Sequence, residues 1–323
     1  MTEIKASKEQ IRKLKNEVQL CGYLAELNPM RTGVTVKDSV PYLAFDGAIQ
    51  CGETPDRTVR FRTFIKSKKQ DGSDSVAFAN AKAWYEAAVP MTKDPEHATR
   101  VEMRGSLTDN PFVNSENKLI EATQFNIQAF FPFTPKAPED YKAVISLEGV
   151  ITGYSPEIVN ENETGRSFMR FMTRDIFGNV IELKNIVVPN DTRISVDILE
   201  ANNYDVNTTT EVGIVLTPAR VARVTKQKGG IGTPVAVVTE KDRIEWVLSY
   251  ANNEETQQLS RENISAMRNA RESALDRVKK DGYKGTAKKP SAPVAGVGAS
   301  EPDVPPTTKS YNSVLEDLND MPF

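Results

Sequence analysis

The chain has 323 residues, of which 39% are hydrophobic and 26% are charged, and its formal net charge is −3. This length is enough for two or three domains, each with a core of its own. The 41 basic and 44 acidic residues are spread along the chain without a basic block. The net charge therefore does not indicate a nucleic-acid partner. Such a partner would have to be bound by a local surface on which basic residues are grouped.

Residue types suited to metal binding or nucleophilic catalysis are few and scattered. The chain has one histidine, His97, in a loop-like context, and two cysteines, Cys21 and Cys51, in apolar strand-like contexts. We expect buried free thiols in a reducing compartment, no metal, no cofactor and no catalytic Ser-His or Cys-His pair. The charged N-terminus does not read as a signal peptide, and no apolar run approaches the roughly 18 residues that a membrane helix needs. We therefore expect a cytoplasmic protein.

The first part of the chain predicts a helix followed by a barrel. Residues 1–16 read as an N-terminal segment with a short charged helix, and five strand-like runs follow over 17–27, 42–51, 58–68, 100–108 and 119–131. Between the third and fourth runs, apolar residues at helical spacing predict a helix over 77–89. Five strands with a helix between the third and the fourth is the order of the OB-fold barrel. We expect an OB-like domain over 17–135.

The same order of elements repeats from residue 141. Leu147 and Gly149 stand 127 positions after Leu20 and Gly22, within runs of similar pattern. Strands over 166–176, 179–188 and 211–224 follow, with a helix expected within 190–203. We therefore predict a mainly β protein with two tandem OB-like five-stranded barrels, the second over 141–240. A single larger β-sandwich is the alternative.

Three segments complete the chain. Residues 241–280 carry an apolar stripe at helical spacing and are predicted to be a helical segment that packs on the second barrel. Residues 281–310 are rich in Gly, Pro, Ala, Ser and Lys, which predicts a disordered linker with a span on the order of 30 Å. Residues 311–323 form an acidic and hydrophobic C-terminal tip.

Two strands are predicted to place cations and aromatic rings on one exposed face. In the third strand this face carries Arg60, Arg62, Phe64 and Lys66, and Tyr42 of the second strand is a further candidate. In the second barrel the candidates are Arg166, Phe168, Arg170, Met172 and Arg174. Cations meet phosphates, and a ring offers a plane on which any base can stack, worth about 1–3 kcal/mol per base. The alternative is a solvated strand face with cross-strand salt bridges.

The last residues of the chain read Asp-Leu-Asn-Asp-Met-Pro-Phe. This tip resembles the C-terminal tip of bacterial and phage single-stranded DNA-binding proteins, which end in several Asp followed by Ile-Pro-Phe after a Gly- and Pro-rich linker. Here Met321 replaces Ile, and Leu318 and Asn319 dilute the acidic run. The resemblance implies a divergent, phage-encoded member, in a bacterial or phage-infected cell. It implies that the tip docks on replication and repair proteins through Asp317, Asp320, Met321, Pro322 and Phe323.

The leading hypothesis is a non-enzymatic protein that binds single-stranded DNA without sequence preference in replication, recombination and repair. It would coat and protect the strand and recruit partner enzymes through the tip. The alternative is a replisome or recombination scaffold whose OB-like domains bind protein instead of DNA. No spaced carboxylate set or nucleophilic lysine motif favours an enzyme. A homo-oligomer is compatible with either hypothesis.

Overall fold

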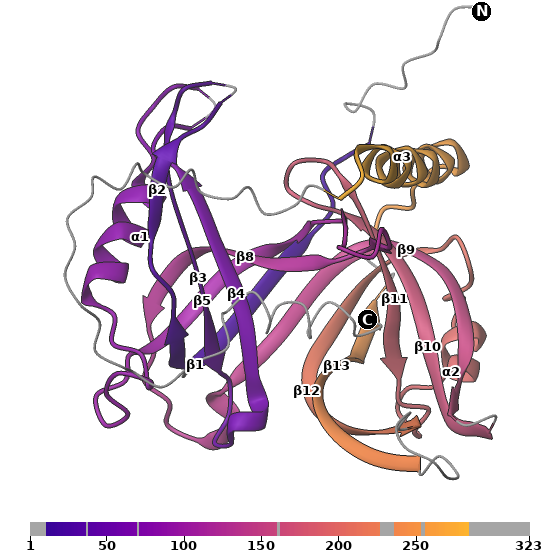
Figure 1. The fold of residues 1–323 in the computed structure, drawn as a ribbon. Coiled ribbons are helices and arrows are strands. Elements are labelled where there is room, and N and C mark those ends of the chain that lie inside the picture. Colours follow the sequence, from indigo (N-terminus) through magenta and orange to yellow (C-terminus); the bar gives the residue numbers. More distant parts are fainter. Residues whose placement is uncertain are drawn as a thin grey trace, which may run out of the picture. The chain divides into compact units, whose positions relative to one another are not determined.

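A computed structural model describes residues 11–36, 38–69, 71–159, 162–226, 236–252 and 256–283 (Figure 1). The chain divides into two compact units. The first comprises residues 1–109 and 123–271, and holds both barrels and the first half of the C-terminal helix. The second comprises residues 110–122 and 272–323, and its described part holds a short hairpin and the end of that helix.

The first barrel is closed by five strands. They are β1 (Asn16–Leu27), β3 (Pro41–Gln50), β4 (Thr58–Lys66), β5 (Arg100–Asp109) and β8 (Thr123–Pro132). Strand β1 pairs with β3 and β5, β3 pairs with β4, and β8 joins β5 in antiparallel and β4 in parallel fashion. Helix α1 (Val76–Ala87) lies between β4 and β5 in sequence, and β2 (Arg31–Val34) adds to the edge of β3. A single turn, η1 (Pro55–Arg57), precedes β4.

The second barrel repeats this connectivity. Its strands are β9 (Lys142–Val159), β10 (Asn162–Arg174), β11 (Val180–Val188), β12 (Thr209–Lys226) and β13 (Ala236–Asn252), with α2 (Val196–Ala201) between β11 and β12. Strand β9 pairs with β10 and β12, and β13 joins β12 in antiparallel and β11 in parallel fashion. A short turn, η2 (Pro138–Asp140), precedes β9. Two tandem OB-like barrels are therefore confirmed, and the single β-sandwich is excluded.

In each barrel, the apolar side chains at alternate positions of the strands fill the interior. In β4, Val59, Phe61, Thr63 and Ile65 are buried while the residues between them are partly or fully exposed. Phe45 of β3 and Phe171 of β10 are fully buried, one in each barrel. Because side chains of a strand point alternately to its two faces, one set builds the core and the other is left for the surface.

The two barrels are joined by their first strands. Residues 16–21 of β1 pair with residues 142–147 of β9 in antiparallel register. As a result the strands of both barrels belong to one sheet of eleven within the described part of the chain. The predicted domain ranges stay predictions. Strand β13 continues to Asn252, beyond the end of the range 141–240.

The helix predicted over 241–280 is wrong in its first part. Helix α3 spans Arg261–Asp281, whereas residues 241–252 belong to β13. Apolar residues at 244, 246, 248 and 250 alternate with other residues, a pattern typical of a strand. The apolar stripe at helical spacing begins only at Ile264, which is buried together with Met267.

The N-terminal helix is not present in the described residues. Residues 12–15 have no regular structure, and β1 begins at Asn16. Leu14 is buried in a small cluster with Ile264 and Met267 of α3, and the Arg12 guanidinium pairs with Glu148 of β9. These contacts favour an extended backbone over a helix in this segment. Residues 1–10 lie outside the described residues.

The buried side chain of Arg271 connects α3 to both barrels, through an ion pair with the first and a hydrogen bond to the second. Arg271 Nη1 lies 2.7 Å from Asp109 Oδ2 at the end of β5, and the same nitrogen donates to the Val180 carbonyl of β11 at 3.2 Å. Both side chains are 6% exposed. Removal of one charge would leave the other buried without a partner, which typically lowers the free energy of unfolding by about 3–5 kcal/mol.

The remaining elements are minor. Strands β6 (Phe112–Val113) and β7 (Leu119–Ile120) form a small hairpin. Cys21 and Cys51 are buried and free, as predicted. No helix in the described ranges is long and apolar enough to cross a membrane. The predicted linker, apart from residues 281–283, and the whole tip lie outside the described residues.

Candidate nucleic-acid interface

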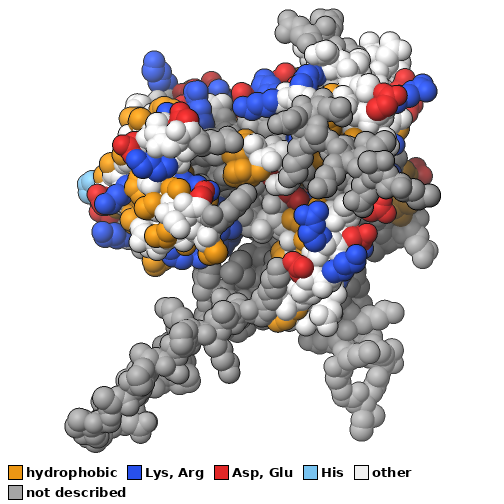
Figure 2. All heavy atoms as spheres, turned by 90° about the horizontal axis from the view of Figure 1, so that it is seen from above, with side chains coloured by type: hydrophobic (Ala, Val, Ile, Leu, Met, Phe, Trp, Pro, Cys, Tyr) orange, Lys and Arg blue, Asp and Glu red, His pale blue; other side chains and the backbone are white. Residues whose placement is uncertain are grey.

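Strands β3 and β4 present the predicted face on the outside of the first barrel. Arg60 is exposed, and Arg62, Phe64 and Lys66 are half-buried, on the opposite side of β4 from the core residues. On β3, Tyr42 pairs with Lys66, and Asp46 pairs with Arg62. The structure thus brings together the five first-barrel residues that the sequence analysis named as candidates. On the face drawn in Figure 2, basic, acidic and apolar side chains of the described residues are interspersed.

Two aromatic rings lie together on this face, near the end of β4. The Tyr42 and Phe64 rings stack, with centroids 5.0 Å apart and planes 29° from parallel. Gly33 of β2 lies opposite Tyr42, and a Cβ at this glycine would come within 2.9 Å of the Tyr42 hydroxyl oxygen. The missing side chain therefore lets the tyrosine ring lie over β2. The stacked pair is a half-buried apolar platform on an otherwise polar face.

The cations around the platform differ in their partners. Arg60 has no hydrogen bond or ion pair to any described residue. Arg62 Nη1 donates to Gln124 at 3.3 Å, and Lys66 Nζ lies 2.6 Å from Asp38, with both ends of that pair about 40% exposed. Ion pairs at such exposed positions contribute little to stability and are easily exchanged for another anion.

One further cation belongs to this face and was missed. Arg31 of β2 forms an ion pair with Asp46 of β3 at 3.3 Å and is largely exposed. The sequence analysis did not predict β2, which has only four residues. Without this strand, no pattern placed Arg31 beside β3.

Strand β10 of the second barrel carries the second predicted group, but a bulge interrupts it. The register with β9 shifts between Arg170 and Phe171, and the register with β11 shifts between Met169 and Phe171. Such a bulge breaks the strict alternation on which the prediction rested. Phe168 is half-buried and Arg170 is exposed, with the Arg170 guanidinium beside Gly153 of β9. Arg170 has no ion pair to a described residue.

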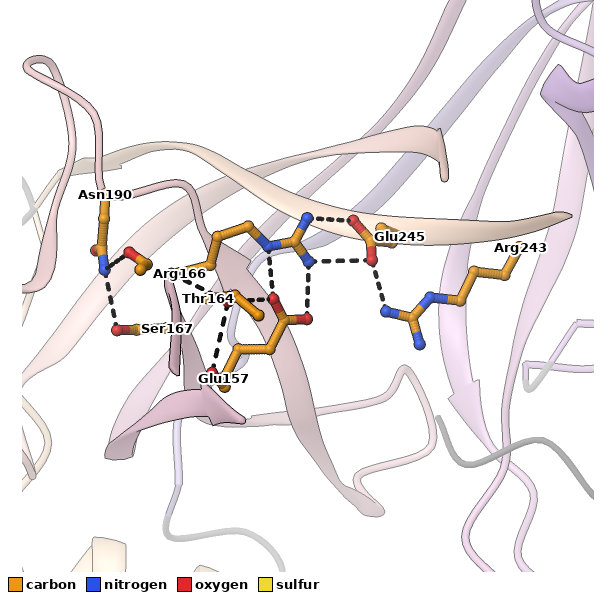
Figure 3. A network of polar contacts seen from close by, with 8 residues as sticks. Glu157, Thr164, Arg166, Ser167, Asn190, Arg243 and Glu245 are labelled. Carbon is orange, nitrogen blue, oxygen red and sulfur yellow. Dashed lines mark hydrogen bonds and ion pairs between the residues drawn. The ribbon is translucent and has the colours of Figure 1, made fainter. Parts of the chain in front are cut away.

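Arg166 is held by two carboxylates. Its Nη1 and Nη2 donate to the two oxygens of Glu245, both at 3.0 Å, and Nη2 also donates to Glu157 at 3.0 Å (Figure 3). Glu245 accepts a further hydrogen bond from Arg243, and Thr164 donates to Glu157. Both carboxylates are buried. The guanidinium of Arg166 is held by these two carboxylates, so Arg166 is not free to bind phosphate.

Met172 and Arg174 are also corrected by the structure. Met172 is 2% exposed and packs with Leu14, Val150 and residues of α3, so the prediction that it shares an exposed face is wrong. Arg174 is half-buried and donates to the Ile11 carbonyl at 2.8 Å and to the Gly178 carbonyl at 3.4 Å. Of the five candidates in the second barrel, Phe168 and Arg170 remain on the accessible surface.

Other aromatic residues already have partners in the protein. Trp84 of α1 stacks on Phe130, and both lie against Phe45 in the first core. Tyr23 of β1 stacks with Tyr141, and the Arg100 guanidinium lies over the Tyr23 ring. Among the described residues, the Tyr42–Phe64 platform and Phe168 are the candidate aromatic groups that lie on a surface with exposed or half-buried cations.

The ion pairs of Arg166 and Arg243 with Glu245 should make the stability of the protein depend on pH. Burial alone raises the pKa of Glu245, but the hydrogen bonds from Arg166 and Arg243 outweigh it and hold this pKa below the ordinary value. A carboxyl group with a lowered pKa in the folded state stabilises the protein above its unfolded pKa, near 4.5, and this contribution is lost as pH falls through the folded pKa. We expect Glu245→Gln to lower the free energy of unfolding at pH 7, and the difference from the natural protein to shrink below pH 4.5. Urea unfolding at pH 7, 5 and 3.5 measures it, and a difference that stays constant with pH would contradict this account.

Two solved structures are similar to this chain. A deletion mutant of the single-stranded DNA-binding protein from Thermus aquaticus is similar at 11% identity, over 78% of this chain and 100% of that chain, with a TM-score of 0.43. The wild-type form of that protein is similar at 12% identity, over 77% and 97%, with a TM-score of 0.42. No curated protein sequence matches.

Among protein families, the model described as YorF matches residues 15–281. This match begins just before β1 and runs to the end of α3, so it includes both barrels. The chain belongs to the YorF family.

Proposed function

We propose that this protein binds single-stranded DNA without sequence preference in DNA replication, recombination or repair, as a binding protein and not as an enzyme. The observation that carries the proposal is the stacked Tyr42–Phe64 pair on the outer face of β3 and β4, the face that also presents Arg60 further along β4. These are the second and third strands of an OB barrel, the strands whose face binds oligonucleotides in OB folds.

The chemistry of this face fits a single strand. An unpaired base can stack on the exposed part of the ring platform, whereas the bases of a duplex are hidden in their own stack. Arg60, which has no ion pair to a described residue, offers a cation to the phosphates, and Arg31 and Lys66 can exchange their exposed carboxylate partners for phosphate. Stacking and phosphate contacts do not distinguish between bases, which supports binding without sequence preference.

The two barrels contribute unequally in this proposal. The first barrel supplies the platform and the cations around it. The second supplies Phe168 and Arg170, since Arg166 is held by Glu157 and Glu245. We propose that the first barrel is the main site and that Phe168 and Arg170 extend it.

Charge removal tests this face. Arg60→Ala should weaken binding to a fluorescent oligo-dT and reduce the slope of log affinity against log salt by about 0.7, the value for one phosphate contact on a single strand. The matched control is Arg193→Ala, which removes the same charge from an exposed position in the second barrel. Fluorescence anisotropy at several salt concentrations, with a duplex of the same length as a second ligand, gives both quantities.

The outcomes separate the two hypotheses for the function. A change in slope with Arg60→Ala and none with Arg193→Ala supports the proposal. Equal effects of the two variants would point to net charge and not to this face. If the natural protein does not prefer the single strand over the duplex, the DNA-binding proposal fails, and a protein scaffold takes its place.

Ring removal tests the platform independently of charge. Phe64→Ala should weaken oligo-dT binding by roughly 5- to 150-fold, which corresponds to the 1–3 kcal/mol of one base stacked on an aromatic ring. Phe177→Ala is the control, since Phe177 is 63% exposed in the turn between β10 and β11. We expect this variant to bind within about twofold of the natural protein. Affinity that is unchanged in Phe64→Ala would remove the platform from the site.

We further propose that the C-terminal tip recruits replication or repair proteins. Pro322 and Phe323 offer a stiff apolar end, and Asp317 and Asp320 steer it toward a basic surface. Deletion of residues 315–323 should leave oligo-dT affinity equal or higher, because the acidic tip competes with DNA for the same cations. The same anisotropy assay measures this, and a large loss of DNA affinity on deletion would overturn the assigned role of the tip.

A further inference from the structure

A groove in the second barrel has no role in the DNA-binding proposal. It has a volume of about 760 Å³ and lies between the segment around α2 and strands β12 and β13. One wall is formed by residues between Pro189 and Tyr204, and the other by Val215, Thr217 and residues 247–252. None of the candidate DNA-binding residues lines it.

One wall of the groove is the free edge of a β-strand. Strand β13 pairs with β11 only at Trp246 and Val247, and it continues to Asn252 with β12 on its other side. Beyond Val247 the edge that faces away from β12 has no strand neighbour among the described residues. Such an edge presents backbone groups that can pair with an added strand.

Ala251 shows which way these backbone groups point. Its carbonyl accepts a hydrogen bond from the Tyr204 hydroxyl at 3.1 Å, and Tyr204 lines the groove. In an antiparallel pair, the N–H and C=O of one residue point to the same edge. The Ala251 N–H is therefore directed into the groove, where no strand of the described chain accepts it.

The groove also has an apolar surface for side chains. Ile198 of α2 is 37% exposed and Val215 of β12 is 36% exposed, and both line the groove. Tyr250 of β13 also lines it, but its ring lies over Gly213 of β12 and its hydroxyl donates to Glu211 at 2.8 Å. Large apolar residues exposed together beside a free strand edge are typical of a surface that binds a peptide.

The charges near the groove determine which peptide fits. Asp197, Glu200 and Asp205 lie on or just after α2, are exposed and have no ion pair to a described residue. The one cation of the described lining, Arg193, is paired with Asp191 at 3.1 Å. Glu200 and Asp205 also act on the barrel itself, since their negative charge adds to burial in raising the pKa of Tyr154. Among the described residues, the charges that line and flank the groove are thus net acidic.

We propose that this groove binds an extended, cationic peptide of a partner protein, which adds as a strand to the free edge of β13. The peptide would place apolar side chains against Ile198 and Val215 and basic ones toward Glu200 and its acidic neighbours. The same charges repel the phosphates of DNA and the acidic tip of this chain. The inference does not depend on the DNA-binding proposal.

The experiment uses the full chain and two fluorescein-labelled synthetic hexapeptides. One alternates lysine and valine, and the other alternates glutamate and valine. Anisotropy should give an affinity at least about tenfold higher for the lysine peptide, because like charges oppose the other one. Glu200→Lys should weaken the lysine peptide several-fold. The matched control, Glu86→Lys, places the same change on exposed α1 of the first barrel and should have no effect.

A second measurement reports on the strand edge itself. Saturation with the lysine peptide should slow hydrogen exchange of the Ala251 amide, and Val215→Ser should weaken binding without a change in fold. No binding of the lysine peptide, equal affinity of the two peptides, equal effects of Glu200→Lys and Glu86→Lys, or unchanged exchange at Ala251 would each overturn the proposal. Oligo-dT binding, measured in parallel, reports on the DNA site alone, so the two proposals can fail separately.

Discussion

The structure depends on the antiparallel pairing of β1 with β9. Val18 pairs with Ile145, and these residues are 127 positions apart, the same offset that relates the two repeats in the sequence. Val18 and Ile145 thus occupy equivalent positions in the two repeats. When equivalent residues pair with each other, the two repeats are related by a local two-fold axis, as in an isologous contact between two identical subunits. The second half of each strand then closes its own barrel, by pairing β1 with β3 and β9 with β10. One backbone interaction thus joins the barrels and covers the strand edge that each would otherwise expose.

The symmetry of the backbone does not extend to the surfaces. In the first barrel, Arg60 has no partner among the described residues and Phe64 stacks with Tyr42. In the second, Arg166 is enclosed by Glu157 and Glu245, and Met172 is covered by α3. Arginine and large apolar residues therefore have different roles on β4 and on β10. The difference comes from the residues that lie next to them in the folded chain. An arginine next to buried carboxylates stabilises the fold, whereas an exposed arginine without a carboxylate partner remains available to a ligand.

This difference also explains what the sequence could and could not predict. The face of β4 follows from alternation within nine residues, and the order of elements was enough to predict two OB-like barrels. The role of Arg166 depends on Glu245, which is 79 positions away in a segment that was assigned to a helix. Once 241–252 was taken as helical, no strand was left to bring that carboxylate to β10. Met172 was misjudged because its cover is supplied by α3, and the bulge at Arg170 leaves no signal in the pattern of residue types.

The two proposed sites select ligands of opposite charge. The face of β3 and β4 offers cations and a ring platform, whereas the groove beside α2 is bordered by carboxylates without an ion pair to a described residue. A nucleic-acid strand and a cationic peptide can therefore be bound by one chain without competing for the same groups. An acidic segment, such as the tip of this chain, is attracted to the first face and repelled by the groove. If the tip competes with DNA, it does so at the first barrel, and a partner peptide in the groove leaves that competition unchanged.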